Sequence, residues 1–151
     1  MKNAITAALL ALAFVGAAQA QSACTCTTGT RTASAAALSS LLSGKMVCAA
    51  VGSEVWQEWH NAGSLVDYKM GPADRNDPST VVGSYVVNGD NTISYTYGAS
   101  TYKYEVCSTA SGAYAFCGAQ FGGRDILGAR VGGKGQLTSC TTVPGFTALK
   151  K

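Results

Sequence analysis

The chain has 151 residues, of which 47% are hydrophobic and only 13% charged, and its formal net charge is +3. This length fits one domain with a buried core of its own. The basic residues are scattered along the sequence, so it indicates neither a nucleic-acid-binding protein nor one that docks on an anionic membrane surface.

The first 20 residues have the layout of a secretory signal peptide. Lys2 precedes an uncharged apolar stretch over residues 4–18, and small residues stand at 18 and 20, as a signal peptidase requires. The stretch is shorter than the roughly 20 residues of a membrane-spanning helix. We therefore predict cleavage after residue 20, a periplasmic or secreted location in a Gram-negative-type bacterium, and no membrane span in the mature chain. Lipidation of Cys24 is the alternative, although no aliphatic residue stands three positions before it.

Residues 21–33 form a cysteine-containing segment ahead of a single domain, which we place at 34–151. An even number of cysteines in a small exported domain predicts disulfides. The closely spaced pair Cys24 and Cys26 also suits a thiol oxidoreductase, but the usual Cys-x-x-Cys motif is missing, so structural bridging is favoured. The six cysteines are Cys24, Cys26, Cys48, Cys107, Cys117 and Cys140.

A helix is predicted over residues 34–44. Ser34 can cap its N-terminus, and Leu38, Leu41 and Leu42 form an apolar stripe at helical spacing. Gly44 can then end it in a left-handed conformation.

After residue 44 the hydrophobic period changes to that of strands. Residues 45–51 are an apolar run, and a turn over 61–64 separates two further strands. In the strand before this turn, Trp56, Glu58 and His60 alternate with Val55, Gln57 and Trp59. A helix there would instead bring Trp56, Trp59 and His60 together.

Glu58 and His60 are also a candidate acid–base pair, as in a hydrolase. No Gly-x-Ser-x-Gly nucleophile motif accompanies them. With one histidine and the cysteines oxidised, too few ligands remain for a zinc site. We therefore predict neither a metal nor a cofactor.

The second half contains short alternating strands separated by turns. Asn88-Gly89 is a strong hairpin signal, and a second turn lies at Ser111-Gly112. Tyr102, Tyr104 and Val106 share one strand face. Further strands are expected over residues 125–131 and 135–140, and residues 72–78 form an irregular loop. Short strands with glycine-rich turns predict an antiparallel barrel or sandwich.

The aromatic residues are good strand formers, and inside a barrel they can also line a ligand pocket. The candidate ligand-binding residues are Trp56, Trp59, Tyr68, Tyr95, Tyr102 and Tyr104.

Cys107 and Cys117 are symmetric about Gly112, which predicts a disulfide across a hairpin. Bridges from Cys26 to Cys48 and from Cys24 to Cys140 are then expected. Which of the two N-terminal cysteines reaches which partner stays open.

Residues 38–118, from LLSGKMVCAAV through VVGSYVVNGDNTISYTYG to YKYEVC, resemble small exported bacterial proteins with calycin-like (lipocalin-like) β-barrels. The resemblance implies such a barrel and a small ligand, and it carries no catalytic residue across.

The sequence thus predicts a mainly β protein, a small disulfide-stapled antiparallel barrel with one N-terminal helix. The expected function is non-enzymatic, either binding a small apolar or amphipathic ligand or acting as an accessory in the envelope, with a small hydrophobic ligand or an envelope protein as the partner. The alternative is a structural or interaction subunit of a surface assembly that uses an exposed strand edge, and the second alternative is a hydrolase or thiol oxidoreductase.

Overall fold

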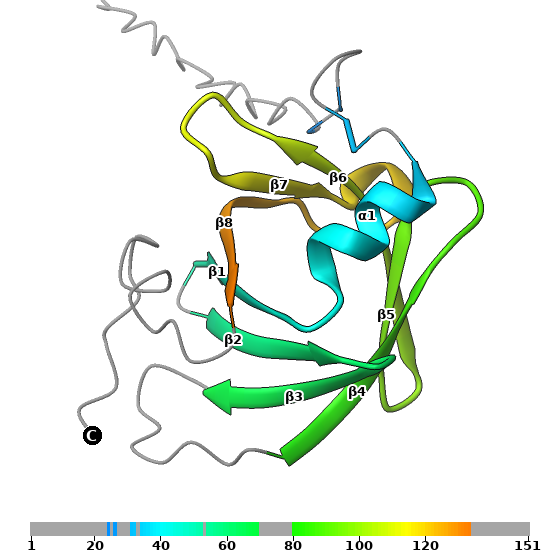
Figure 1. Ribbon diagram of the computed structural model, residues 1–151, viewed down its shortest axis with the longest axis vertical. Helices are drawn as coiled ribbons and strands as arrows, with labels where there is room; N and C mark the ends of the chain where they lie inside the picture. The colour runs from blue at the N-terminus through cyan, green and yellow to red at the C-terminus, as the bar shows by residue number, and fades with distance from the viewer. Residues whose placement is uncertain are drawn as a thin grey trace, which may run out of the picture.

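Eight antiparallel strands close into a barrel in the computed structural model (Figure 1). The structure describes residues 24, 26, 31–32, 34–52, 54–69 and 80–133. The helical elements are α1 (Ala35–Leu42) and the short 3-10 helix η1 (Ala119–Phe121). The strands are β1 (Lys45–Val51), β2 (Glu54–Asn61), β3 (Ser64–Lys69), β4 (Thr80–Val87), β5 (Ile93–Tyr97), β6 (Ser100–Ser108), β7 (Tyr114–Cys117) and β8 (Ile126–Gly133). The predicted fold class is confirmed.

The predicted helix begins where expected. The Ser34 side chain accepts a hydrogen bond from the Ala37 N–H at 3.1 Å, which satisfies one of the free donors of the first turn. Gly44 follows the helix with a φ of 70°, a left-handed conformation that glycine adopts without steric cost. Its N–H donates to the His60 carbonyl at 2.8 Å, and strand β1 begins at the next residue.

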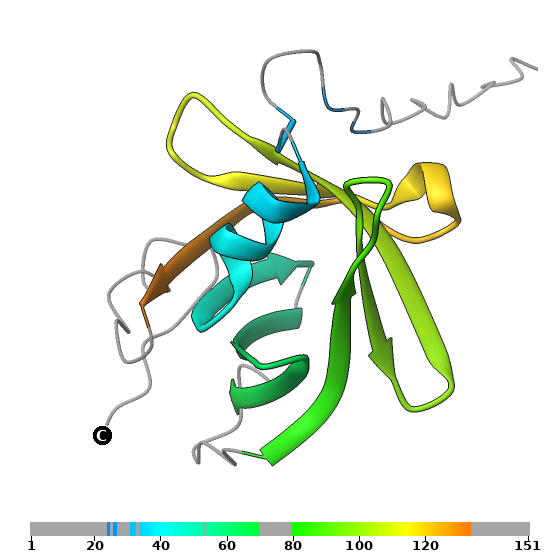
Figure 2. The same ribbon diagram turned by 45° about the vertical axis from the view of Figure 1, so that its right-hand side comes forward.

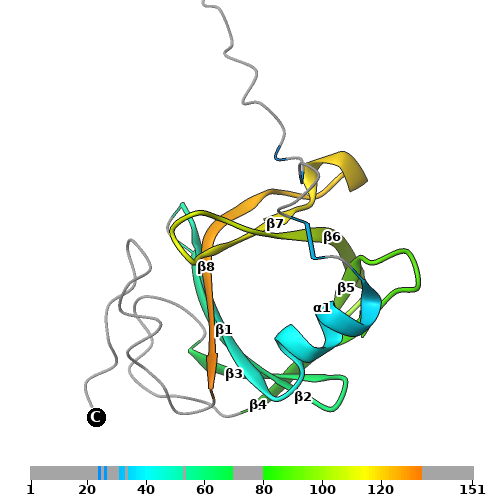
Figure 3. The same ribbon diagram turned by 45° about the horizontal axis from the view of Figure 1, so that its top comes forward.

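Helix α1 lies across one end of the barrel (Figures 2 and 3). Leu38 and Leu42 are fully buried there, in one core cluster with Leu65 and Ile93 from the wall. The Ala35 N–H also donates to the Asn91 side chain at 2.7 Å, which ties the helix to the β4–β5 turn. The apolar stripe of the helix therefore closes this end with packed side chains.

The hairpins predicted at residues 61–64 and at Asn88-Gly89 are present. β2 pairs with β3 around a turn at Ala62 and Gly63, so the segment with the two tryptophans is a strand and not a helix. β4 pairs with β5 across the Asn88-Gly89 turn. The strand expected over 135–140 and the loop expected over 72–78 lie outside the described residues.

Alternation along the strands decides which side chains enter the barrel. On β6, Tyr104 and Val106 are buried in the central core cluster. Cys107 points outward into a separate cluster with Cys117 of β7. The shared face predicted for Tyr104 and Val106 is therefore the inner one.

The predicted bridge between Cys107 and Cys117 is wrong, because the register of the hairpin differs from the expected one. Ala115 lies opposite Cys107, and Glu105 lies opposite Cys117. The hairpin is thus symmetric about residue 111 and not about Gly112, which makes the two cysteines diagonal neighbours. Their sulfurs lie 3.7 Å apart without a bond between them.

Each of these cysteines is bonded instead to the N-terminal segment. The bridges are Cys24–Cys117 and Cys26–Cys107, with Cα–Cα distances of 5.2 and 5.6 Å. The predicted partners of Cys24 and Cys26 are therefore also wrong. Beyond them, the Thr32 N–H donates to the Val106 carbonyl at 2.9 Å and Arg31 forms an isolated antiparallel bridge with Cys107, so this part of the segment runs alongside β6. Cys48 is disulfide-bonded as well, and Cys140 lies outside the described residues.

Within the described residues, no helix has the length and apolar character that crossing a membrane requires. The disulfides are compatible with an oxidising compartment outside the cytoplasm.

Candidate binding pocket

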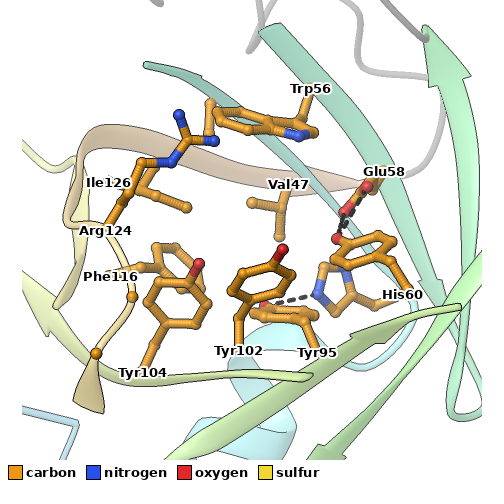
Figure 4. A pocket seen from close by; sticks show the side chains of 14 residues that line it. Val47, Trp56, Glu58, His60, Tyr95, Tyr102, Tyr104, Phe116, Arg124 and Ile126 are labelled. Carbon is orange, nitrogen blue, oxygen red and sulfur yellow. Dashed lines mark hydrogen bonds between the residues drawn. The ribbon is translucent and has the colours of Figure 1, made fainter. Parts of the chain in front are cut away.

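A cavity of about 530 Å³ occupies the barrel interior on the side away from α1 (Figure 4). Its mouth is formed by side chains near the β1–β2 turn, the β5–β6 turn and the loop that follows η1. Cavities of this size hold small organic molecules. The barrel therefore has one end packed by the helix and a cavity at the other.

Aromatic side chains form a large part of the cavity wall. Tyr95 and Tyr104 meet edge to face with ring centroids 5.8 Å apart, and Tyr104 meets Phe116 in the same way at 6.2 Å. Such pairs are favourable beyond the area they bury. The aromatic lining residues are Trp56, Tyr95, Tyr97, Tyr102, Tyr104 and Phe116.

Two glycines leave the space that the tyrosine rings occupy. A Cβ on Gly83 would collide with the Thr96 carbonyl oxygen and would lie 3.0 Å from the Tyr97 ring. A Cβ on Gly118 would lie 2.6 Å from the Tyr104 ring. The rings of Tyr97 and Tyr104 can therefore pack directly against bare backbone.

Glu58 projects into the cavity from β2 and is only 7% exposed. The Tyr97 hydroxyl lies 2.7 and 3.0 Å from its two carboxyl oxygens and donates to them. Burial raises the pKa of Glu58 to about 7; the hydrogen bond from Tyr97 acts against this rise, and the nearby charge of Asp67 adds to it. Among the described residues, Glu58 has no salt bridge.

His60 lies deeper, at the floor of the cavity, and is 1% exposed. Its Nε2 is 2.9 Å from the Tyr95 hydroxyl, and its ring packs against Tyr85 at 4.7 Å. Burial lowers the pKa of His60 to about 4, with a smaller opposing effect from the Glu58 backbone. The imidazole is therefore neutral at physiological pH.

The mouth of the cavity is more exposed. Tyr102 is 41% exposed, and the Arg124 side chain lies beside Trp56, across the mouth from Glu58 (Figure 4). The neighbouring Asp125 accepts hydrogen bonds from the Gly118, Ala119 and Cys24 backbone N–H groups. Partial burial acts to raise the pKa of Asp125, but these donors lower it overall, and they hold the loop that carries Arg124.

Four of the six predicted ligand-binding residues line this cavity: Trp56, Tyr95, Tyr102 and Tyr104. Trp59 does not line it. Its neighbours in the strand, Glu58 and His60, face the cavity, and adjacent strand positions face opposite sides of the wall. Tyr68 lies in β3, and its side chain is outside the described part of the structure.

The sequence interpretation considered Glu58 and His60 only as catalytic groups, and it left out Tyr97 and Arg124. Alternation offered a signal for three of these four. Glu58 and His60 share a face with Trp56, and Tyr97 shares one with Tyr95. Nothing in the sequence indicated Arg124, because its position at the mouth depends on the loop after η1.

The cysteine cluster on the outer wall is a separate feature. The sulfurs of Cys26, Cys107 and Cys117 lie within 4.8 Å of one another. All three belong to bridges, and only a thiolate is a metal ligand or a nucleophile. These sulfurs therefore serve as structural links in this state.

The chain was compared with protein-family models, curated proteins and solved structures, and none of them matches it.

Proposed function

We propose that this protein is an exported, calycin-like binding protein that holds a small, largely apolar molecule in the open end of its barrel. The observation that carries the proposal is the cavity itself, with an aromatic wall and a few buried polar groups. A predominantly apolar lining with a small number of fixed polar groups is typical of ligand sites. The disulfides and the amino-terminal sequence agree with export.

Barrel closure favours a pocket over partner binding through a strand edge. Each of the eight described strands is hydrogen-bonded to a neighbour on both sides, including β1 with β8. Strand addition needs unpaired backbone groups along an edge. Closure leaves no described strand with a wholly free edge, and the N-terminal segment already pairs with β6 beyond the end of β5.

Tryptophan fluorescence tests ligand binding with a matched pair of variants. Trp59→Phe leaves Trp56 in the cavity as the single tryptophan, and Trp56→Phe leaves Trp59 on the opposite side of the wall. Titration with the neutral probes 2-phenylethanol and 1-octanol should shift the Trp56 emission to the blue in a saturable manner, because the ligand displaces water from the indole. The Trp59 emission should stay constant.

A third variant fills the cavity. Ala49 lines it and is 4% exposed, so Ala49→Phe should abolish the shift while far-ultraviolet circular dichroism stays unchanged. If Ala49→Phe does not fold, chemical-shift mapping on the natural chain serves instead. The proposal fails if neither probe moves Trp56 emission or the resonances of cavity residues.

An acid–base enzyme is the second candidate, and the pKa of Glu58 favours it. A buried carboxyl whose pKa is close to 7 can both take and give a proton at physiological pH. An enzyme of this kind would bind its substrate normally in Glu58→Gln and lose turnover. Unchanged turnover in that variant would exclude Glu58 as the acid–base group.

A further inference from the structure

We propose that the ligand is an organic ammonium ion, with its charged group held between the Glu58 carboxylate and the tyrosine rings and its apolar body toward the mouth. This inference rests on the proposed binding function and names the chemical class of the ligand.

The carboxyl group of Glu58 has unused acceptor capacity inside the cavity. An ionised carboxylate offers about four acceptor sites, and the Tyr97 hydroxyl has a single proton to donate to them. A buried charge is costly unless it is paired. A ligand that brings both a positive charge and N–H donors would therefore complete this site.

The walls around Glu58 suit a cation for an independent reason. Aromatic rings carry negative charge density on their faces and attract a cation within about 6 Å of the ring centroid. Tyr95 and Tyr104 line the same space as Glu58 (Figure 4), and Tyr97 lines it as well. A cation placed there would lie among aromatic side chains and beside a carboxylate, whereas an anion would be repelled by the carboxylate.

The charged and titratable groups that face Glu58 leave it as the recognition group. On its own strand His60 is neutral, because burial lowers its pKa to about 4. From β3, Asp67 adds negative charge. From β5 and β6 come Tyr95, Tyr97 and Tyr104, whose pKa values burial raises, so they stay neutral.

Arg124 is the positive group of the cavity lining, and it lies at the exposed mouth. Its position across the mouth from Glu58 (Figure 4) gives the cavity a negative interior and a positive rim. This polarity orients an ammonium group inward and disfavours a second positive charge on the outer end of the ligand. The ligand class is therefore a monoamine with an apolar body.

The test compares 2-phenylethylammonium with 2-phenylethanol, which has a similar shape and no charge, and with phenylacetate, which is negative. Affinities are measured by titration calorimetry on the full mature chain at pH 8.5 and pH 5.5. At pH 8.5 the ammonium ion should bind at least about tenfold more tightly than the alcohol, an advantage within the range of desolvated cation–aromatic contacts. At pH 5.5 Glu58 is protonated before binding, so this ratio should fall toward one.

Proton release gives a second reading of the same site. Near pH 6.5, binding of the ammonium ion should expel the Glu58 proton, because the bound cation favours the ionised carboxyl. The observed heat should therefore depend on the ionisation enthalpy of the buffer and report up to about one proton released. Binding of the alcohol should show no such dependence.

A matched pair of variants separates the pocket charge from net charge. Glu58→Gln should remove the preference for the ammonium ion and keep the affinity for the alcohol. Glu105→Gln removes the same charge from the outer wall, where Glu105 pairs with Arg31 at 3.1 Å, and should keep the preference. Tyr97→Phe should keep the ring but raise the pKa of Glu58 further, which moves the loss of ammonium binding to a higher pH.

The possible failures are distinguishable. If neither the ammonium ion nor the alcohol binds, the proposed function fails. If the alcohol binds as tightly as the ammonium ion at pH 8.5, or if phenylacetate is preferred, the binding function stands and the ammonium inference is overturned. If Glu58→Gln does not fold, equal buffer-dependent heats for the ammonium ion and the alcohol in the natural chain overturn the inference.

Discussion

Replacement of Glu58 by Gln should make the free energy of unfolding depend on pH over a range in which that of the natural chain is nearly constant. Burial raises the pKa of Glu58 from its ordinary value of 4.5 to about 7, and burial lowers that of His60 from 6.5 to about 4. These two groups lie two residues apart on β2. Their contributions to the free energy of unfolding have opposite signs over almost the same pH range.

For Glu58, the folded state keeps its proton to a higher pH than the unfolded state does. Its contribution to stability is therefore lost as pH rises from 4.5 to about 7. For His60, the unfolded state binds a proton between pH 6.5 and about 4, whereas the folded state stays unprotonated in this range. Its contribution is therefore lost as pH falls from 6.5 to about 4.

The two effects are similar in size. One unit of pKa difference corresponds to about 1.36 kcal/mol, so each residue changes the free energy of unfolding by about 3 kcal/mol across its range. In the natural chain they nearly cancel between pH 4.5 and 6.5. Glu58→Gln should leave a rise of about 3 kcal/mol from pH 4 to 6.5, and His60→Gln should leave a comparable fall from pH 4.5 to 7.

The assay is urea unfolding at intervals between pH 4 and 8, with the disulfides intact. The profile of each variant is set beside that of the natural chain, in which the two effects should nearly cancel between pH 4.5 and 6.5. The low pKa values of Asp90, which is hydrogen-bonded to Lys103, and of Asp125 place their effects mainly below pH 4. A flat profile for Glu58→Gln, or profiles of equal slope for both variants, would refute this account of the cavity.

Three further predictions follow from the packing and the bridges. Gly83→Ala should lower the free energy of unfolding by about 1–3 kcal/mol and displace the Tyr97 ring, whereas Gly89→Ala, which has open space around it, should be nearly neutral in urea unfolding. Replacing both cysteines of either N-terminal bridge by alanine should cost about 3 kcal/mol in urea unfolding, because the other bridge already closes most of the same loop. Removing both bridges should cost about 7 kcal/mol, and simple additivity would contradict this nested arrangement. Peptide mapping without reduction should find Cys48 joined to Cys140, the one cysteine that the two N-terminal bridges leave for it; a Cys48 peptide linked to any other cysteine would contradict this.

The sequence by itself determined the local elements. The apolar stripe, Ser34 and Gly44 define the helix, because capping and helical period are properties of neighbouring residues. The alternation of Tyr102, Tyr104 and Val106, like the Asn88-Gly89 turn, defines strands and a hairpin for the same reason. These signals were sufficient for the fold class and for four residues of the cavity wall.

Only the tertiary structure decided the partners across the barrel. A shift of one residue in the centre of the β6–β7 hairpin moves each residue's partner by two positions, and this shift separates Cys107 from Cys117. The N-terminal cysteines then reach them over the outer wall. In the cavity, Glu58 and Tyr97 are 39 residues apart in the chain and meet only because the barrel closes. Pairing across a closed sheet depends on loop register and on all eight strands together, and a local pattern does not contain that information.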